Sequence, residues 1–376
     1  MFPFYSSLQV ISKATGAASA AVGVSVMAGS RFGSEGQGLL LKHMAFKGTT
    51  SRSDIRLARD LEEAGVSVSS AVGRERFVLS ASGEPGPVLS TGATAVADTL
   101  LSLKTVDWNV AEVKNEFVAK QLASVTPEQI LEDKIHAAAF GEESALGQPL
   151  HTAGDGSVSG SALEAYLATA VAAPGSVTFV GAGGITHGDV VAQAEALFSG
   201  VSLGDPSRML ASPFVGGSAS LKLALPVTRV AVAIQGATLG GEDYATSLVI
   251  KELLGPGGFA FSYSDAGLVG LAGSAEPPAA GALTESFAAA LTSSYSDTAV
   301  AAAKTAVKTK MLFALEDAAT CIGDLAAAGV SAGDIKAVDA VTAASVNAFT
   351  GKAAPALATV GSASAVPAYN TLAAMF

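Results

Sequence analysis

Few residues in this sequence could bind a metal ion or act as a nucleophile, and they are scattered along the chain. The single cysteine, Cys321, excludes an intramolecular disulfide and any cysteine-based zinc site, so we expect a small buried side chain. The four histidines are His43, His136, His151 and His187. Only His43 lies in a segment of further chemical interest, and we expect the other three to be ordinary polar residues.

Two glycine-rich segments could in principle cradle a phosphate group. Leu254–Gly258 lacks the Gly-Lys-Ser/Thr ending of a P-loop, and Phe259 follows where a charged side chain would be needed. Gly181–Gly184 fails the dinucleotide-binding pattern because Thr186 occupies the position of its last glycine. We therefore predict a glycine-rich turn after a helix at Leu254–Gly258 and no bound nucleotide at either place.

Two acidic pairs, Glu62-Glu63 and Glu142-Glu143, are typical of solvated helix ends or turns. An interior lined by acids that receives basic peptides is the alternative interpretation. Nothing in the sequence places these carboxylates in a cavity, so we expect them at the surface.

The composition restricts the class of protein. The 376 residues carry a net charge of −11, which argues against binding the phosphate backbone of nucleic acids. Charged residues make up 15% of the chain, whereas soluble domains usually carry about 25%. Mean hydropathy is +0.45. Such a chain is either embedded in a membrane or covered over much of its surface by partners.

Three stretches run long without a charged residue: Ala14–Ser30, Ala165–His187 and Ala353–Phe376. Each is interrupted by Gly, Ser, Thr or Pro, and none is a solid apolar block of about 20 residues. We therefore expect no membrane-spanning helix, which favours a surface covered by partners. The first residues also lack the features of a transit peptide or a secretory signal.

Hydrophobic periodicity predicts a strand, a turn and a helix near the N-terminus. Ala21–Ala28 alternates as a strand, Gly29–Gly33 breaks it, and Glu35–Phe46 follows as a buried helix. Further strands are expected at Val66–Ser70, Arg76–Ala81 and Val177–Gly181, and further helices at Val88–Leu103, Val110–Leu122 and His187–Phe198.

A second helix is expected to begin with Ser51 or Ser53 as its N-cap. Its apolar face is expected to consist of Ile55, Ala58 and Leu61.

The second half of the chain repeats this pattern. A constant offset lays Val22–Val26 on Val230–Ile234 and Leu40-Leu41 on Leu248-Val249. Ala356–Gly361 likewise echoes Val177–Gly181. We predict two related α+β domains, at residues 1–202 and 217–376, joined by a loop-like linker at residues 203–216.

The segment Gly38–Thr49, with the sequence GLLLKHMAFKGT, resembles the zinc-binding helix of the pitrilysin-type metallopeptidases, the inverzincins. The motif of that family is H-x-x-E-H followed by M-A-F-K-G-T. Its two histidines share one helix face and bind Zn²⁺, and its glutamate deprotonates the metal-bound water. The resemblance extends over nearly the whole chain, through segments such as Leu61–Gly65, Phe140-Gly141 and Leu146–Leu150.

The resemblance also implies which positions would carry the chemistry, and these positions have changed. Leu39 replaces the first histidine, Lys42 replaces the general base, and only His43 is retained. The third ligand of the family, a glutamate from a later helix, falls on Lys120 by spacing, although Glu116 and Glu112 lie nearby. An alkyl group and two ammonium groups would not hold Zn²⁺. We therefore expect no metal, no cofactor and no catalytic residue.

For the fold, the resemblance implies two homologous α+β domains, each a mostly antiparallel sheet packed with helices. Ala260–Gly270 is similar to a stretch of the core subunits of mitochondrial ubiquinol–cytochrome c reductase, respiratory complex III. This similarity implies a non-catalytic structural subunit that lies peripherally on the matrix face of the inner membrane. The implied partners are core subunit 1, as a heterodimer, and the cytochrome b, cytochrome c1 and Rieske subunits of a dimeric complex.

A presequence-binding subunit of a mitochondrial processing peptidase is the alternative. In that subunit the family has a longer glycine loop than Gly255–Gly258 of this chain. An active zinc protease is disfavoured by the positions that have changed.

Overall fold

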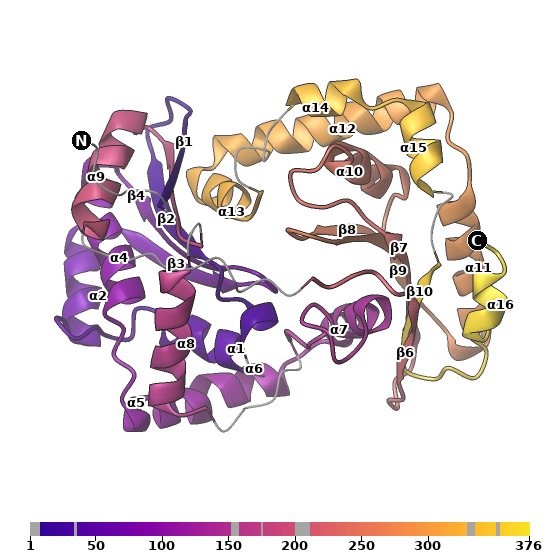
Figure 1. Ribbon diagram of the computed structural model, residues 1–376, viewed down its shortest axis with the longest axis horizontal. Helices are drawn as coiled ribbons and strands as arrows, with labels where there is room; N and C mark the ends of the chain where they lie inside the picture. The colour runs from indigo at the N-terminus through magenta and orange to yellow at the C-terminus, as the bar shows by residue number, and fades with distance from the viewer. Residues whose placement is uncertain are drawn as a thin grey trace. The chain divides into compact units, whose positions relative to one another are not determined.

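The chain forms two compact units in the computed structural model (Figure 1). The structure describes residues 8–33, 36–151, 158–173, 176–199, 211–328, 335–350 and 354–376. Unit 1 comprises Met1–Ala123, Ala153–Met209 and Leu312–Gly333, and unit 2 comprises Ser124–Thr152, Leu210–Met311 and Asp334–Phe376.

Unit 1 is built on a five-stranded mixed sheet in the order β1-β5-β2-β4-β3. Its strands are β1 (Gln9–Ala14), β2 (Ala20–Val26), β3 (Ser67–Val72), β4 (Phe77–Gly83) and β5 (Thr178–Gly183). β1 pairs with β5 in parallel, and the other three pairings are antiparallel. The predicted strands in this half are therefore confirmed, and so is the mostly antiparallel sheet.

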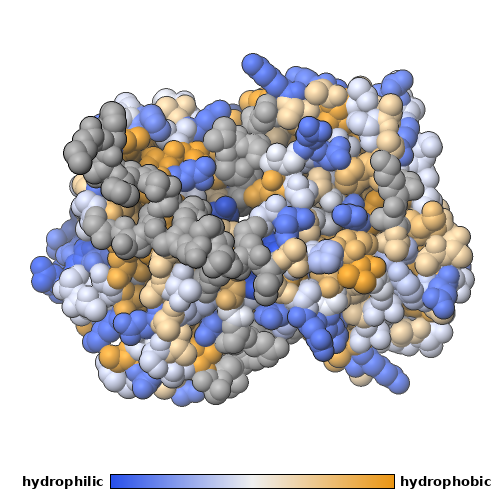
Figure 2. All heavy atoms as spheres, viewed as in Figure 1, coloured by the Kyte–Doolittle hydropathy of each residue, from blue (hydrophilic) through white to orange (hydrophobic). Residues whose placement is uncertain are grey.

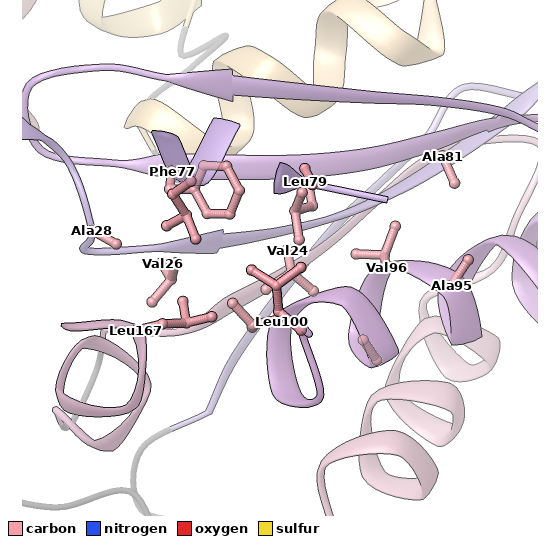
Figure 3. Packing of buried hydrophobic residues seen from close by; sticks show 14 of the residues in the cluster. Val24, Val26, Ala28, Phe77, Leu79, Ala81, Ala95, Val96, Leu100 and Leu167 are labelled. Carbon is pink, nitrogen blue, oxygen red and sulfur yellow. The ribbon is translucent and has the colours of Figure 1, made fainter. Parts of the chain in front are cut away.

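One face of this sheet carries the main apolar core of unit 1. Val22, Val24 and Val26 of β2 alternate toward it and are at most 1% exposed. Figure 3 shows Val24, Val26, Phe77 and Leu79 directed toward helices that cover this face. The helical segments of unit 1 are η1 (Ser30–Phe32), α1 (Gln37–Met44), α2 (Asp54–Glu63), α3 (Pro85–Pro87), η2 (Val88–Gly92), α4 (Ala93–Leu101), α5 (Asp107–Val113), η3 (Lys114–Val118), α6 (Ala119–Ala123), α8 (Gly160–Ala172), α9 (His187–Phe198) and α13 (Ala318–Ala328).

The opposite face of the same sheet is covered by α13, which comes from the C-terminal half of the chain. Small residues of β2 allow the close approach: a methyl group at Gly23 would lie 2.6 Å from Cγ2 of Ile322. The Ser25 hydroxyl donates a hydrogen bond to the Ala326 carbonyl at 3.2 Å. Cys321 lies in this contact at 1% exposure, which confirms the prediction of a buried cysteine.

Unit 2 repeats the architecture of unit 1. Its sheet has the order β6-β10-β7-β9-β8, with β10 parallel to β6 and the other pairings antiparallel. The strands are β6 (Gly217–Leu221), β7 (Thr228–Gln235), β8 (Gly258–Ser262), β9 (Gly267–Ala275) and β10 (Ala356–Val360). β7 corresponds to β2 and β10 to β5, so the internal repeat predicted from the sequence is confirmed.

Each face of the second sheet is also covered by helices. α7 packs on one face, against small side chains that include Ala231, Ala233 and Ala358. Helices α10 and α11 pack on the other face. The helical segments of this part of the chain are α7 (Pro127–Phe140), α10 (Tyr244–Leu253), η4 (Pro277–Ala279), α11 (Ala280–Thr292), α12 (Asp297–Glu316), α14 (Ile335–Ala340), α15 (Ala343–Thr350) and α16 (Tyr369–Ala373).

The two units are interleaved in sequence, whereas the predicted domains are contiguous. Residues 124–152, placed by sequence in the N-terminal domain, pack in unit 2, and residues 312–333 of the predicted C-terminal domain pack in unit 1. The predicted elements include neither α7 nor α13, the two helices responsible for this difference. Much of the predicted linker, residues 203–210, lies outside the described residues.

Local predictions succeed where capping and periodicity are strong. Ser53 caps α2, since its hydroxyl accepts a hydrogen bond from the Arg56 amide at 3.3 Å. Of the predicted apolar face of this helix, Leu61 is buried, but the prediction is wrong for Ala58, which is exposed, and for Ile55, which is 70% exposed. Leu57 is the other buried residue. Leu57 and Leu61 are four residues apart, which places them on one face, and Ile55 lies outside it.

Within the part of the chain that the structure describes, no helix has the length and apolar character needed to cross a bilayer.

Replacement of Ile322 by Ala should lower the free energy of unfolding by about 2–5 kcal/mol, because the side chain is fully buried against β2. The exposed Ile55→Ala is the matched control and should change it by less than about 0.5 kcal/mol. Urea unfolding followed by circular dichroism measures both. Equal effects of the two substitutions would contradict the packing of α13 on this sheet.

Candidate functional site

The candidate site lies on α1, the helix that carries the metallopeptidase-like motif. Leu40, Leu41 and Met44 are at most 2% exposed and belong to the apolar core of unit 1. The helix packs against β3, α5, η3 and α8. Burial of these apolar side chains explains why the segment is helical, since the sequence gives it no side-chain N-cap.

One face of α1 carries the side chains at the positions that the family motif assigns to metal binding and catalysis. Leu39, Lys42 and His43 stand at i, i+3 and i+4, so they share one helix face. Leu39 is 3% exposed and packs in the core, whereas Lys42 and His43 are partly exposed. One imidazole, one alkyl side chain and one ammonium therefore occupy the positions of two ligands and a general base.

The second part of the motif, Met44–Thr49, forms a tight turn that leaves α1. Phe46 has a φ of +60°, a left-handed conformation that is strained for a side chain of this size, and Gly48 has a φ of +118°. The Thr49 amide donates to the Arg52 carbonyl at 2.8 Å, and the Thr49 hydroxyl accepts from the Arg52 amide at 3.1 Å. These bonds hold the turn in place, so this part of the motif has a structural role.

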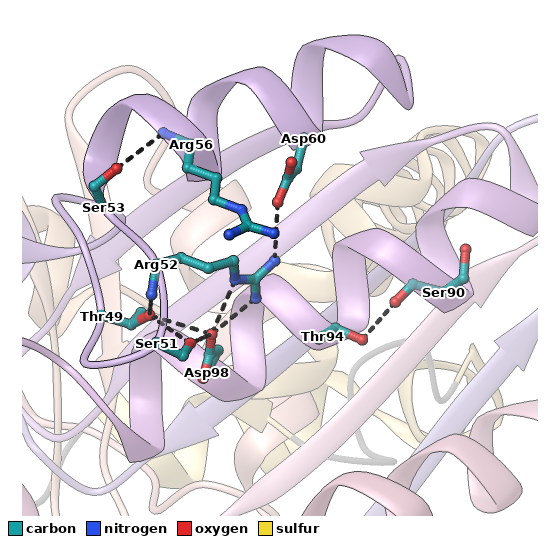
Figure 4. Close-up of polar contacts among 9 residues, drawn as sticks. All are labelled: Thr49, Ser51, Arg52, Ser53, Arg56, Asp60, Ser90, Thr94 and Asp98. Carbon is teal, nitrogen blue, oxygen red and sulfur yellow. Dashed lines mark hydrogen bonds and ion pairs between the residues drawn. The ribbon is translucent and has the colours of Figure 1, made fainter.

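Asp98 of α4 anchors that turn to the rest of unit 1 (Figure 4). Its Oδ2 accepts hydrogen bonds from Nη2 of Arg52 at 2.8 Å, from the Ser51 hydroxyl at 2.9 Å and from the Thr49 hydroxyl at 3.2 Å. Burial alone would raise the pKa of Asp98, but the hydrogen bonds and charge of Arg52, with those of the two hydroxyls, lower it below its ordinary value. Sequence analysis missed this carboxylate, which lies 46 residues from Arg52.

The position that spacing assigns to the third ligand, Lys120, lies on α6. Lys120 follows η3, a turn of π-helix, and its side chain is 74% exposed. Its Nζ lies 3.7 Å from Oε1 of Glu116, a carboxylate that is itself 51% exposed. The preceding segment η3 packs against α1, and Lys120 follows it on α6.

The residues present do not fit a catalytic zinc ion. Such an ion needs three protein ligands with lone pairs, whereas Leu39 has none and Lys120 is a cation at neutral pH. Among the described residues, no three His, Cys, Asp or Glu side chains are grouped closely enough to hold a metal. No hydrolytic step can therefore be derived at this site.

The other histidines have structural contacts. His136 is fully buried: its Nδ1 donates to the Glu132 carbonyl at 2.7 Å, and its Nε2 accepts from the Tyr263 hydroxyl at 2.6 Å. We assign this tautomer from the network, since a carbonyl can only accept. His187 Nδ1 lies 2.7 Å from the Ser12 hydroxyl, and His151 Nε2 lies 3.5 Å from Oε1 of Glu132.

The glycine-rich segment Leu254–Gly258 and the two acidic pairs lie in the kinds of structure predicted for them, whereas Gly181 and Gly183 belong to strand β5. Gly255–Gly257 forms the turn between α10 and β8, and Glu62-Glu63 and Glu142-Glu143 are exposed at a helix end and in a turn. Gly257 and Gly258 also line a pocket of unit 2 that sequence analysis missed. The signal in the sequence was the helical spacing of four of its lining residues, which come from a helix that was not predicted: Glu128, Leu131, Glu132 and Ile135.

The N-terminal part of the chain matches a known protein family. Residues 9–153 match the family described as insulinase (Peptidase family M16). The matched range contains the motif helix, its anchoring turn and Lys120, and it agrees with the family that the motif predicts.

Curated relatives of the chain include subunits of mitochondrial enzymes. The chain is 30% identical over 258 residues to the mitochondrial-processing peptidase subunit beta of Lentinula edodes, covering 64% of this chain and 54% of the relative. It is 29% identical over 245 residues to the ubiquinol-cytochrome-c reductase complex core protein I of Euglena gracilis, covering 62% and 48%. In these matches the chain spans about half the length of the relative.

A third relative matches over a longer range. The mitochondrial-processing peptidase subunit alpha of Solanum tuberosum is 24% identical over 426 residues, which cover 98% of this chain and 83% of the relative.

The purified chain should contain less than about 0.1 zinc ion per molecule, because a site with one imidazole does not retain Zn²⁺. The double variant Leu39→His with Lys42→Glu should remain free of zinc and of peptidase activity, since Lys120 still occupies the third position. It should also unfold more easily, by about 1–3 kcal/mol, because a buried imidazole without a partner replaces a core leucine. Elemental analysis by mass spectrometry measures the metal, and one zinc ion per chain in either protein would contradict the assignment.

Asp98→Asn should lower the free energy of unfolding at neutral pH by about 1–3 kcal/mol, the range for a hydrogen-bonded charge. A lowered folded-state pKa means that Asp98 stabilises the fold above its unfolded pKa of about 3.9, and that this stabilisation is lost as the pH falls through the folded-state pKa. The difference between the two proteins should therefore shrink below about pH 4. Urea unfolding across pH measures it, with the exposed Glu62→Gln as control; a difference independent of pH would contradict the role of the carboxylate.

Proposed function

We propose that this chain, which carries an insulinase-type Peptidase family M16 domain, is a non-catalytic structural subunit of a mitochondrial assembly. The observation that supports the proposal is which side chains α1 carries at the motif positions and how the following turn is held. Leu39 packs in the core, Lys42 takes the place of the general base, and the following turn is retained by the Thr49–Arg52–Asp98 hydrogen bonds. The helix keeps its packing and its anchoring, and it lacks the groups that hydrolysis needs.

The surface supports a role in an assembly. Ile55, Trp108, Val215 and Phe313 are each at least 64% exposed in a chain with few charged residues. Trp108, the only tryptophan, lies 5.4 Å from the Lys104 ammonium in a cation–π contact. Interfaces are enriched in aromatic residues and depleted of charge at their centres, so such residues favour surfaces covered by partner subunits.

The specific assembly we propose is ubiquinol–cytochrome c reductase, in which this chain would be core subunit 2. Core subunit 1 would be its heterodimeric partner, with the cytochrome b, cytochrome c1 and Rieske subunits in the same complex. It would lie peripherally on the matrix face of the mitochondrial inner membrane. Support comes from the similarity to a core protein of Euglena gracilis and from Ala260–Gly270, which forms most of the β8–β9 hairpin.

The alternative is a non-catalytic presequence-binding subunit of a mitochondrial processing peptidase. One observation favours it: the similarity to a subunit alpha of such a peptidase extends over 98% of this chain. In this function the chain would present substrates to an active partner.

Native electrophoresis after gentle detergent extraction of mitochondria should place the tagged chain in a large assembly that contains haem. The Lys42→Glu variant should assemble equally well, because the proposed role does not use the motif chemistry. Co-migration only with a soluble peptidase subunit would replace the proposal by the alternative. Migration as an isolated chain would contradict both.

A further inference from the structure

Unit 2 contains a pocket of about 340 Å³ between α7 and the sheet, which falls within the range of small-molecule sites. It exists because α7 covers only part of this face. The helix packs against β6, β10 and β7, whereas the next two strands in the sheet, β9 and β8, lie to one side of it. The space-filling view shows hydrophilic and hydrophobic side chains intermixed over the surface of unit 2 (Figure 2).

Small side chains form the floor of the pocket. Ala231 of β7 pairs with Ala272 of β9, and Gly273 and Gly258 also line the space. The walls are larger: Leu131 and Ile135 come from α7, and Phe259 and Phe261 come from β8, with their ring centroids 5.4 Å apart. The interior is therefore suited to the apolar body of a ligand, such as an aromatic ring or a short alkyl chain.

Three charged groups line one side of the pocket, and two of them neutralise each other. Nε of Arg229 donates to Oε1 of Glu128 at 2.7 Å, and this hydrogen bond lowers the pKa of Glu128, so the pair remains ionised. The third group is Glu132, one helical turn after Glu128. The lining therefore carries one negative charge that Arg229 does not balance.

The Glu132 carboxylate has no hydrogen-bond donor among the described residues, although its side chain is only 31% exposed. Nε2 of His151 lies 3.5 Å from Oε1 of Glu132 and makes no hydrogen bond. The neighbouring Asp133 differs: its two oxygens accept from the Leu150 and His151 amides at 2.8 and 3.0 Å. The oxygens of Asp133 are already occupied by two amides, so Glu132 is available to a ligand in a way that Asp133 is not.

We propose that this pocket binds an organic cation with an apolar body, whose ammonium group donates hydrogen bonds to the Glu132 carboxylate. The apolar body would lie between α7 and the Phe259–Phe261 pair, over the alanine floor. Charge complementarity decides the class: an anion would have to compete with Glu128 for Arg229 and would face Glu132. The inference uses only contacts within unit 2 and does not depend on the proposed function.

Isothermal titration of the full chain with phenylbutylamine, phenylbutanol and phenylbutyrate at neutral pH tests this assignment. The three probes share one apolar body and differ in charge. We expect the amine to bind about tenfold more tightly than the alcohol, the ratio expected for one charge-assisted hydrogen bond, and the acid to bind most weakly. Tightest binding of the acid, or no binding of any probe, would overturn the proposal.

Substitutions in the pocket test where the ammonium group and the apolar body of the probe bind. Glu132→Gln should remove the preference for the amine over the alcohol, whereas Glu142→Gln, the same change at a 72%-exposed position outside the pocket, should preserve it. Ala272→Leu should fill the floor and weaken all three probes, with its urea unfolding midpoint as the check that the chain still folds. An unchanged preference in Glu132→Gln would place the ammonium elsewhere and refute the proposal.

Discussion

The fold depends on the close packing of one helix against a small-residue face of each sheet. In unit 1, α13 reaches β2 because Ala21 and Gly23 leave room for Ile322. In unit 2, α7 lies on alanines of β7 and β10. Larger side chains on these strands would hold the helix away and leave cavities. Small apolar residues are thus required for close packing at these two sheet faces.

Packing also explains why the helix with the metallopeptidase-like motif keeps its structure. Helix α1 is held by its apolar residues and by the turn at Thr49, and neither depends on metal ligands. Loss of a ligand at position 39 can even favour packing, because a leucine side chain fills a site where an imidazole would need a polar partner. Chemistry can therefore disappear from such a helix while its architecture persists.

How much of the molecule could be predicted depended on the range of the interactions. The Ser53 cap and the helix His187–Phe198 are local and were predicted correctly, and the repeat of β2 in β7 follows from alternation alone. The exchange of α7 and α13 between the two units was not predicted, because the strands that they cover lie far away in the chain. The pocket was missed for the same reason, since Glu128 and Arg229 are 101 residues apart. Helix α7 itself was missed although Thr126 and Gln129 form a capping box at its start.

The interleaving of the two units along the chain has a consequence for folding during protein synthesis. The first sheet requires Ala318–Ala328 to cover its second face, so translation must pass residue 328 before the N-terminal half can complete its core. Until then the uncovered face of β2 and β5 stays accessible to solvent and to other chains. A nascent protein with this topology has a long vulnerable interval on the ribosome, during which a chaperone would have to shield that face.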